Sequence, residues 1–316
     1  MRASSWLNLA GLAIGLVGLV IVTHALGWSG IHMAIVDTGA WFGVIAVIDL
    51  AGICCDAFAI HGFLGRTVPY PKVFAAQASG LAINRLTPAN SLGEPVKVTM
   101  LNRDTETTTA IAAIVMFNLT TMYAGIVAIV IGVPLTALLL DLPPTASLVA
   151  WIGLGVLVVF AIAIAVLVRR GAVGTIVGLL AKLRLISRER AMRWATQIDT
   201  QLRGLVGAKQ GVAGVIGSRL CNWAGTVVMI HACGISVTAP LVIAMLSVGI
   251  LVTWMSNIVP LGLGIADGTN YILYGLLGAS PAEGLVYTMV NRVRTIVIAL
   301  IGLTIMAIAN AVAKRR

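Results

Sequence analysis

Residues 84–101 read NRLTPANSLGEPVKVTML, a polar stretch inside a strongly apolar chain. Pro88 and Pro95 lack an amide donor, and each disfavours helix in the residue before it. Gly93 permits a sharp reversal. Broken backbone at membrane depth is tolerated only inside protein or along a wet cavity. The stretch therefore predicts the tip of a re-entrant helix-turn-helix hairpin over 73–101; the alternative is a cytoplasmic loop between two spans.

A second broken stretch echoes the first. Residues 257–270 read NIVPLGLGIADGTN, again with Asn, Pro, Gly and an acid in apolar surroundings. The prolines are one position out of register, but four pairs of polar residues are 173 positions apart: Asn84 and Asn257, Glu94 and Asp267, Asn118 and Asn291, Asp49 and Asn222. This shared offset predicts a duplicated unit with a second re-entrant hairpin over 239–278. The expected turn residues of the two hairpins are Pro88, Gly93, Pro260, Gly264 and Gly268.

The composition excludes a soluble domain. Of 316 residues, 59% are hydrophobic and 10% are charged, and the mean hydropathy is +1.02. These values are typical of an all-α polytopic membrane protein. The net charge of +10 comes from Lys and Arg clustered in loops, where they set topology, so no nucleic-acid partner is expected. The four cysteines form no CxxC pair, and we expect neither a metal nor a cofactor.

Six segments are apolar enough to cross a bilayer, which takes about 20 residues. We expect a single transmembrane domain over 1–316, with a first repeat over 1–146 and a second over 147–316. The basic insert 169–209 is expected to be a cytoplasmic amphipathic helix, with a solvated linker as the alternative. The six predicted spans are 7–26, 34–60, 108–131, 148–168, 211–233 and 283–311.

Basic residues set the expected topology. Arg66 and Lys72, the insert 169–209 and residues 314–316 should all be cytoplasmic, which places both termini inside. The hairpins then enter from opposite faces, and the three-span halves are inverted, as in secondary transporters. One question stays open, because 239–259 is long enough to cross alone.

Two motifs carry a family resemblance. The first has an Asn, a Pro, a Gly-Glu pair and a basic residue: Asn84, Pro88, Gly93, Glu94 and Lys97. The second has a Pro, a Gly-Leu-Gly run, an acid-Gly pair and an Arg in the next span: Pro260, Gly262, Leu263, Gly264, Asp267, Gly268 and Arg292. Together they resemble the signatures of the lysylphosphatidylglycerol synthase transmembrane-domain family of flippase-like membrane proteins, over nearly the whole chain. Asp267 stands where Glu is expected, and Ala89-Asn90-Ser91 where glycines or a basic residue are expected, so the lipid stays undefined.

The resemblance implies a multi-pass protein of a bacterial inner membrane that moves anionic phospholipids or lipid-linked sugars between leaflets. Its implied partners are membrane lipids with an anionic headgroup, and a second copy of the chain is a possible partner. The soluble aminoacyl-transferase domain of the name-giving members is not expected, since the chain ends at Arg316, so neither lysyl transfer nor another enzymatic activity is expected. The alternatives are a membrane-embedded lipid-modifying enzyme and a transporter of a small soluble anion.

Two polar stripes in predicted spans mark the candidate site: Arg219, Asn222, Trp223 and Thr226 in one, and Thr288, Asn291, Arg292 and Thr295 in the other, with Tyr287 and Arg294 at its edge. An Arg at the bilayer centre costs at least about 2.5 kcal/mol, and its planar fork suits phosphate. The alternative is pairing with Asp49, Asp56, Glu94 or Asp267 as internal glue. The candidate substrate-binding residues are Arg219, Arg292, Glu94, Asp267, Asn84, Arg85, Asn257, Asn118, Asn291, Lys97, Asn222 and Asp49.

The two acids of the broken stretches are expected at the hairpin tips. Glu94 and Asp267 could pair with the arginines in the empty cavity, or titrate and couple transport to protons. The alternative for each is a cap or first-turn residue on the helix that follows its tip, where a carboxylate is stabilised by the helix dipole.

Overall fold

The computed structural model describes residues 38–87, 92–139, 144–170, 208–256 and 263–315, together with isolated positions before residue 38. Within these residues the chain forms nine helices and no strand, which confirms the predicted all-α class. The helices are α3 (Trp41–Phe63), α4 (Tyr70–Leu86), α5 (Gly93–Leu101), α6 (Thr107–Leu139), α7 (Pro144–Arg170), α10 (Lys209–Ala232), α11 (Ala239–Ser256), α12 (Ile265–Leu276) and α13 (Pro281–Arg315).

Five of these helices are long and apolar enough to cross a membrane: α3, α6, α10, α11 and α13. Helix α7 contributes a further apolar stretch, Ala150–Val166. The predicted span 7–26 and most of the insert 169–209 lie outside the described residues. The chain is therefore an integral membrane protein. Helix α11 has 18 residues, so the length of 239–259 does allow a crossing, but α12, with 12 residues, follows it directly.

Helices α3 and α10 form a close antiparallel pair. The ring of Trp41, at the start of α3, meets that of His231, at the end of α10, with centroids 5.0 Å apart. At the other end, a Cβ added to Gly62 would lie 2.8 Å from the backbone nitrogen of Gly211. Small residues at such contacts let membrane helices approach to backbone contact. The pair therefore fixes which residues of α3 face α10.

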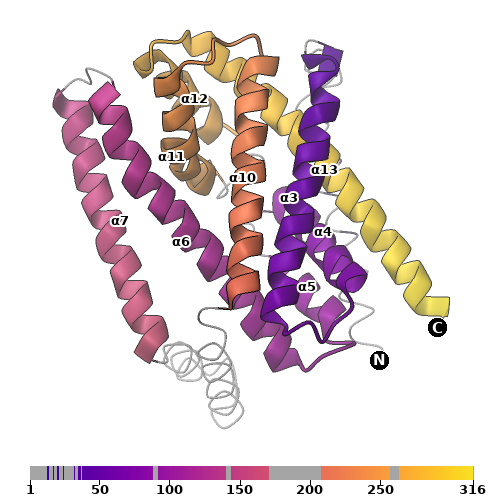
Figure 1. The fold of residues 1–316 in the computed structure, drawn as a ribbon. Helices are drawn as coiled ribbons and strands as arrows, with labels where there is room; N and C mark the ends of the chain where they lie inside the picture. The colour runs from indigo at the N-terminus through magenta and orange to yellow at the C-terminus, as the bar shows by residue number, and fades with distance from the viewer. Residues whose placement is uncertain are drawn as a thin grey trace.

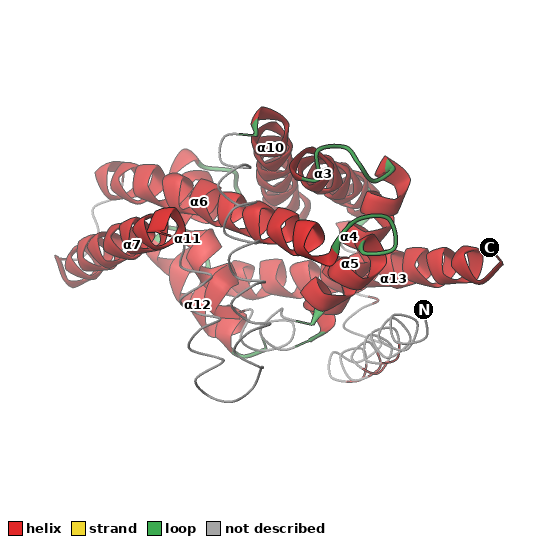
Figure 2. Ribbon diagram, turned by 90° about the horizontal axis from the view of Figure 1, so that it is seen from below, coloured by secondary structure: helices red, strands yellow, loops and turns green. Residues whose placement is uncertain are grey.

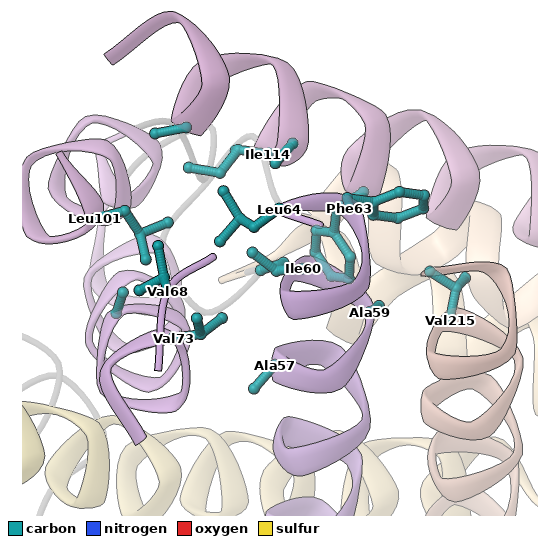
Figure 3. Packing of buried hydrophobic residues seen from close by; sticks show 14 residues of the cluster. Ala57, Ala59, Ile60, Phe63, Leu64, Val68, Val73, Leu101, Ile114 and Val215 are labelled. Atoms are coloured by element: carbon teal, nitrogen blue, oxygen red, sulfur yellow. The ribbon is translucent and has the colours of Figure 1, made fainter. Parts of the chain in front are cut away.

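Two apolar clusters mark the two ends of the bundle. The first joins the start of α3 to the end of α10, the start of α11, the end of α12 and the start of α13, through Ile45, Met229, Leu241, Tyr274 and Tyr287. The second joins the end of α3 to the start of α4, the end of α5 and the starts of α6 and α10 (Figure 3), through Ile60, Val73, Leu101, Ile114 and Val215. Each hairpin thus begins and ends at one end of the bundle.

The two helix-turn-helix units lie at opposite ends. Helices α4 and α5 occupy the lower half of Figure 1, and α11 and α12 the upper half. The ends of the first unit meet where Lys72 pairs with Asp104. In the second, Leu241 at the start of α11 and Tyr274 near the end of α12 belong to the same apolar cluster. The outer ends of the two units therefore lie at opposite ends of the bundle.

The order of the elements repeats along the chain: a long helix, two shorter helices and a second long helix, first as α3 to α6 and then as α10 to α13. Helix α7 connects the two sets and lies at the edge, alongside α6 (Figure 2). Helices α5 and α12 begin at Gly93 and Ile265, and α6 and α13 at Thr107 and Pro281. These starts are 172 and 174 positions apart, close to the polar offset of 173.

Cysteine labelling tests the arrangement of the two ends. With the natural cysteines replaced by Ser, Glu106→Cys, just before α6, and Ala282→Cys, in the first turn of α13, should react with a membrane-impermeant maleimide from opposite faces. Both positions are accessible, and they lie at opposite ends of the bundle. Reaction of both from the same face of sealed vesicles would contradict the arrangement; both should react after permeabilisation.

Candidate functional site

A cavity of about 190 Å³ lies where α4, α10, α11, α12 and α13 converge. We call it the arginine cavity, because its walls carry Arg85 of α4, Arg219 of α10, and Arg292 and Arg294 of α13. No described carboxylate lines it. Arg219 and Arg292 belong to separate polar stripes in the sequence, and the fold brings both to this cavity.

Arg294 is held by a carboxylate outside the cavity. Its Nε donates to Oδ2 of Asp49 on α3 at 2.7 Å, and its Nη2 pairs with Oδ1 of the same carboxylate. The side chains are only 11% and 13% exposed. A bidentate pair of this kind is strong and directional. The pair therefore ties α13 to α3, and it gives Asp49 a structural role next to the cavity.

Arg292 is held by the second hairpin. Its Nη2 lies 2.5 Å from Oδ2 of Asp267, and that oxygen also accepts the backbone N–H of Gly264 at 2.9 Å. Gly264 has φ +79°, a conformation that glycine adopts without strain, and it begins α12. Asp267 is therefore both a first-turn cap of α12 and a partner of Arg292, so the two predicted alternatives hold together.

Glu94 belongs to a separate network at the first hairpin. Its Oε1 accepts Nδ2 of Asn84 and Nζ of Lys97, each at 2.9 Å. Oδ1 of Asn84 in turn accepts the N–H of Gly93 at 2.6 Å, and Lys97 Nζ sits 5.7 Å above the Phe117 ring. None of these groups lines the arginine cavity. The network closes α4 onto α5, and the predicted site residues therefore fall into two groups.

Arg219 and Arg85 differ from the other two arginines. Arg219 donates Nη2 to the backbone oxygen of Thr121 on α6 at 3.0 Å, and it has no ion pair with a described carboxylate. Gly125 of α6 lies beside this nitrogen, since an added Cβ would be in ordinary van der Waals contact with it at 3.6 Å. Arg85 makes no hydrogen bond or ion pair with any described residue. Two guanidinium groups thus reach the cavity without a paired carboxylate.

The remaining predicted residues include some that line the arginine cavity, some that do not, and some that lie outside the described residues. Asn222 and Asn291 line the arginine cavity, whereas Asn118 is exposed on α6 and does not. Gly268 lies inside α12 rather than in a turn, so its predicted role as a turn residue is wrong: the helix begins three positions earlier, at Ile265, after the Gly264 cap. Asn257, Pro88 and Pro260 lie outside the described residues.

Three polar groups on the cavity wall were not among the candidate substrate-binding residues, although Trp223 belongs to one of the predicted polar stripes. The buried Nε1 of Trp223, Oγ of Ser256 and Oδ1 of Asn270 have no hydrogen-bond partner in the described part of the chain. Nδ2 of Asn270 donates to Thr288 Oγ1 at 2.8 Å, which aims the amide. Asn270 follows Lys97 by the same offset of 173 positions, a signal that could have found it.

The Arg294–Asp49 pair makes a stability prediction. Asp49→Asn should lower the stability by about 3–5 kcal/mol, because breaking a buried pair leaves an uncompensated charge. Thermal unfolding in detergent measures this loss. The control is Asp104→Asn, whose Lys72 partner is 45% exposed and which should cost about 1 kcal/mol or less. Equal losses from the two variants would contradict the structural role of Asp49.

A comparison with protein families agrees with these features. The model described as the lysylphosphatidylglycerol synthase TM region matches residues 8–302. No curated protein and no solved structure matches the chain. The match spans every residue that lines the arginine cavity, and the chain belongs to the family of the lysylphosphatidylglycerol synthase transmembrane region.

Proposed function

We propose that the protein moves an anionic lipid between the two leaflets, with the headgroup passing through the arginine cavity. The observation that carries this proposal is a cavity with four guanidinium groups and no described carboxylate on its walls. Arginine forks match phosphate oxygens in geometry and charge. A phosphate in this position would accept hydrogen bonds that the protein alone leaves unmade.

The charge balance supports an anionic substrate. Arg292 and Arg294 each have a carboxylate partner, whereas Arg85 and Arg219 have no ion pair with any described residue. An unpaired charge in the membrane interior is costly, so such residues mark substrate pathways more often than packing. A phosphate bound between Arg85 and Arg219 would supply the missing negative charge.

The shape of the cavity suits an amphiphile better than a soluble ion. Its α11 wall presents apolar side chains: Met245, Leu246, Ile250 and Val252. A headgroup can bind the arginines while the adjoining glycerol and acyl carbons contact this wall. The unpartnered Trp223 N–H and Ser256 O–H are donors for further headgroup oxygens. A small soluble anion is the second candidate, because the arginines alone would serve it equally.

The proposal includes an inverted repeat in the inner membrane. The repeated order of helices, the shared offset and the opposite directions of α3 and α10 support it. In inverted repeats the substrate site lies at the midplane, and one half moves against the other. Arg66, Lys72, Arg103 and Lys209 lie at the end where the first hairpin enters, which we take as the cytoplasmic end, with both termini inside.

A leaflet-exchange assay in vesicles with labelled phosphatidylglycerol tests the proposal. Arg219→Ala should slow exchange by roughly 10- to 100-fold, because a hydrogen bond to a charged group contributes about 1.5–3 kcal/mol. Arg219→Lys should also be slow, since a point charge does not reproduce the planar fork. Arg103→Ala, on an exposed loop, should keep the wild-type rate.

Wild-type exchange by folded Arg219→Ala protein would rule out the arginine cavity as the path. Loss of folding in that variant, seen as a shifted elution volume in detergent, would show that Arg219 is structural. Uptake of free phosphate into vesicles, without movement of phosphatidylglycerol, would favour the soluble-anion alternative.

A further inference from the structure

A second, smaller cavity adjoins the arginine cavity. We call it the carboxylate cavity, because Asp49 and Asp56 of α3 lie on its walls; its volume is about 90 Å³. Four residues line both spaces: Arg85, Asn222, Arg294 and Thr295. A change of charge in one cavity therefore changes the electrostatic potential in the other.

Asp56 is unlike the other carboxylates near the site. Asp49 and Asp267 each pair with an arginine, whereas Asp56 has no ion pair with a described residue. Its Oδ2 accepts Nε2 of Gln77 on α4 at 3.1 Å, and the hydroxyl of Ser218 on α10 interacts with it. A carboxylate without a paired cation in the membrane interior is a candidate for a functional role, because burying it there is costly. Neutral donors thus hold Asp56 in place.

Gln77 can serve both protonation states of Asp56. Its side chain is 2% exposed, and its Oε1 has no hydrogen-bond partner among the described residues. An amide offers a donor and an acceptor. The NH₂ donates to the ionised carboxylate, and after a half-turn of the amide Oε1 can accept from a carboxylic acid O–H. This pairing suits a carboxyl group that gains and loses a proton.

The charged and titratable groups around Asp56 come from five helices: Asp49 and Cys55 of α3, Arg85 of α4, Lys97 of α5, Arg219 of α10 and Arg294 of α13. Arg294 is committed to Asp49 and Lys97 to Glu94. The cations whose field changes when an anion binds are therefore Arg85 and Arg219.

We propose that Asp56 is a proton-binding site that couples passage of the anionic headgroup to one proton; this rests on the proposed function. In the empty protein, the positive charges of Arg85 and Arg219 favour the ionised form of the carboxylate. A monoanionic phosphate that binds them cancels this field, and Asp56 takes one proton from water, forming a carboxyl O–H. The proton returns to water when the headgroup leaves. One negative headgroup and one proton then cross together without net charge.

Infrared difference spectroscopy tests the proton directly. Spectra of the protein in phosphatidylcholine vesicles are compared before and after phosphatidylglycerol is added. The wild type should gain the C=O stretch of a protonated carboxyl group, and isotope-labelled aspartate should shift it. Asp56→Asn should lose the whole band, Asp56→Glu should restore it at a shifted position, and Glu106→Gln should leave it unchanged. No band in the wild type, or the same band in Asp56→Asn, overturns the assignment.

A transport measurement separates this inference from the proposed function. A gradient of about one pH unit should bias the wild-type distribution of phosphatidylglycerol by up to about tenfold, since each unit is a factor of ten in proton activity. Asp56→Asn should exchange the lipid without any bias. If the wild type moves phosphatidylglycerol but the pH gradient does not bias its distribution, the proton site alone is overturned. If the wild type does not move the lipid, the proposed function is contradicted, and the infrared band then decides whether Asp56 binds a proton.

Discussion

A guanidinium group in the membrane interior needs negative charge nearby, and this requirement governs the centre of the molecule. Two arginines of α13 meet it with carboxylates: Arg294 with Asp49 of α3, and Arg292 with Asp267 of α12. These pairs fix α13 against α3 and against α12. Arg85 and Arg219 have no such carboxylate in the described chain, so the packing that satisfies half of the arginines leaves the other half for a ligand.

The broken helices place these charges. An unbroken span would carry its polar side chains along its whole length. A helix that ends inside the bundle places the charged residues of its last or first turn there. Arg85 is in the last turn of α4, and Asp267 is in the first turn of α12. Gly93 and Gly264 make the two returns possible, the first by close approach to α4 and the second by its positive φ. The end of α4 and the start of α12 thus contribute directly to the wall of the cavity.

The all-α class and the two broken elements could be predicted from the sequence, because prolines and charges in apolar sequence have few structural solutions. The pairing of Arg294 with Asp49, 245 positions away, could not. Membrane helices are apolar on both their lipid-facing and their packed sides, so periodicity does not reveal which face is inside. Glu94 was predicted to be near the arginines, but Lys97 is only three positions away, and the local pair forms instead.

The most direct test of the central claim is to identify the lipid that the purified protein retains. Native mass spectrometry of the protein purified from vesicles of equal phosphatidylglycerol and phosphatidylcholine measures this. The wild type should retain phosphatidylglycerol in preference, and the double variant Arg85→Ala, Arg219→Ala should lose that preference while keeping the Arg292–Asp267 and Arg294–Asp49 pairs. Equal retention of both lipids by the wild type would contradict the claim that the unpaired arginines bind an anionic headgroup.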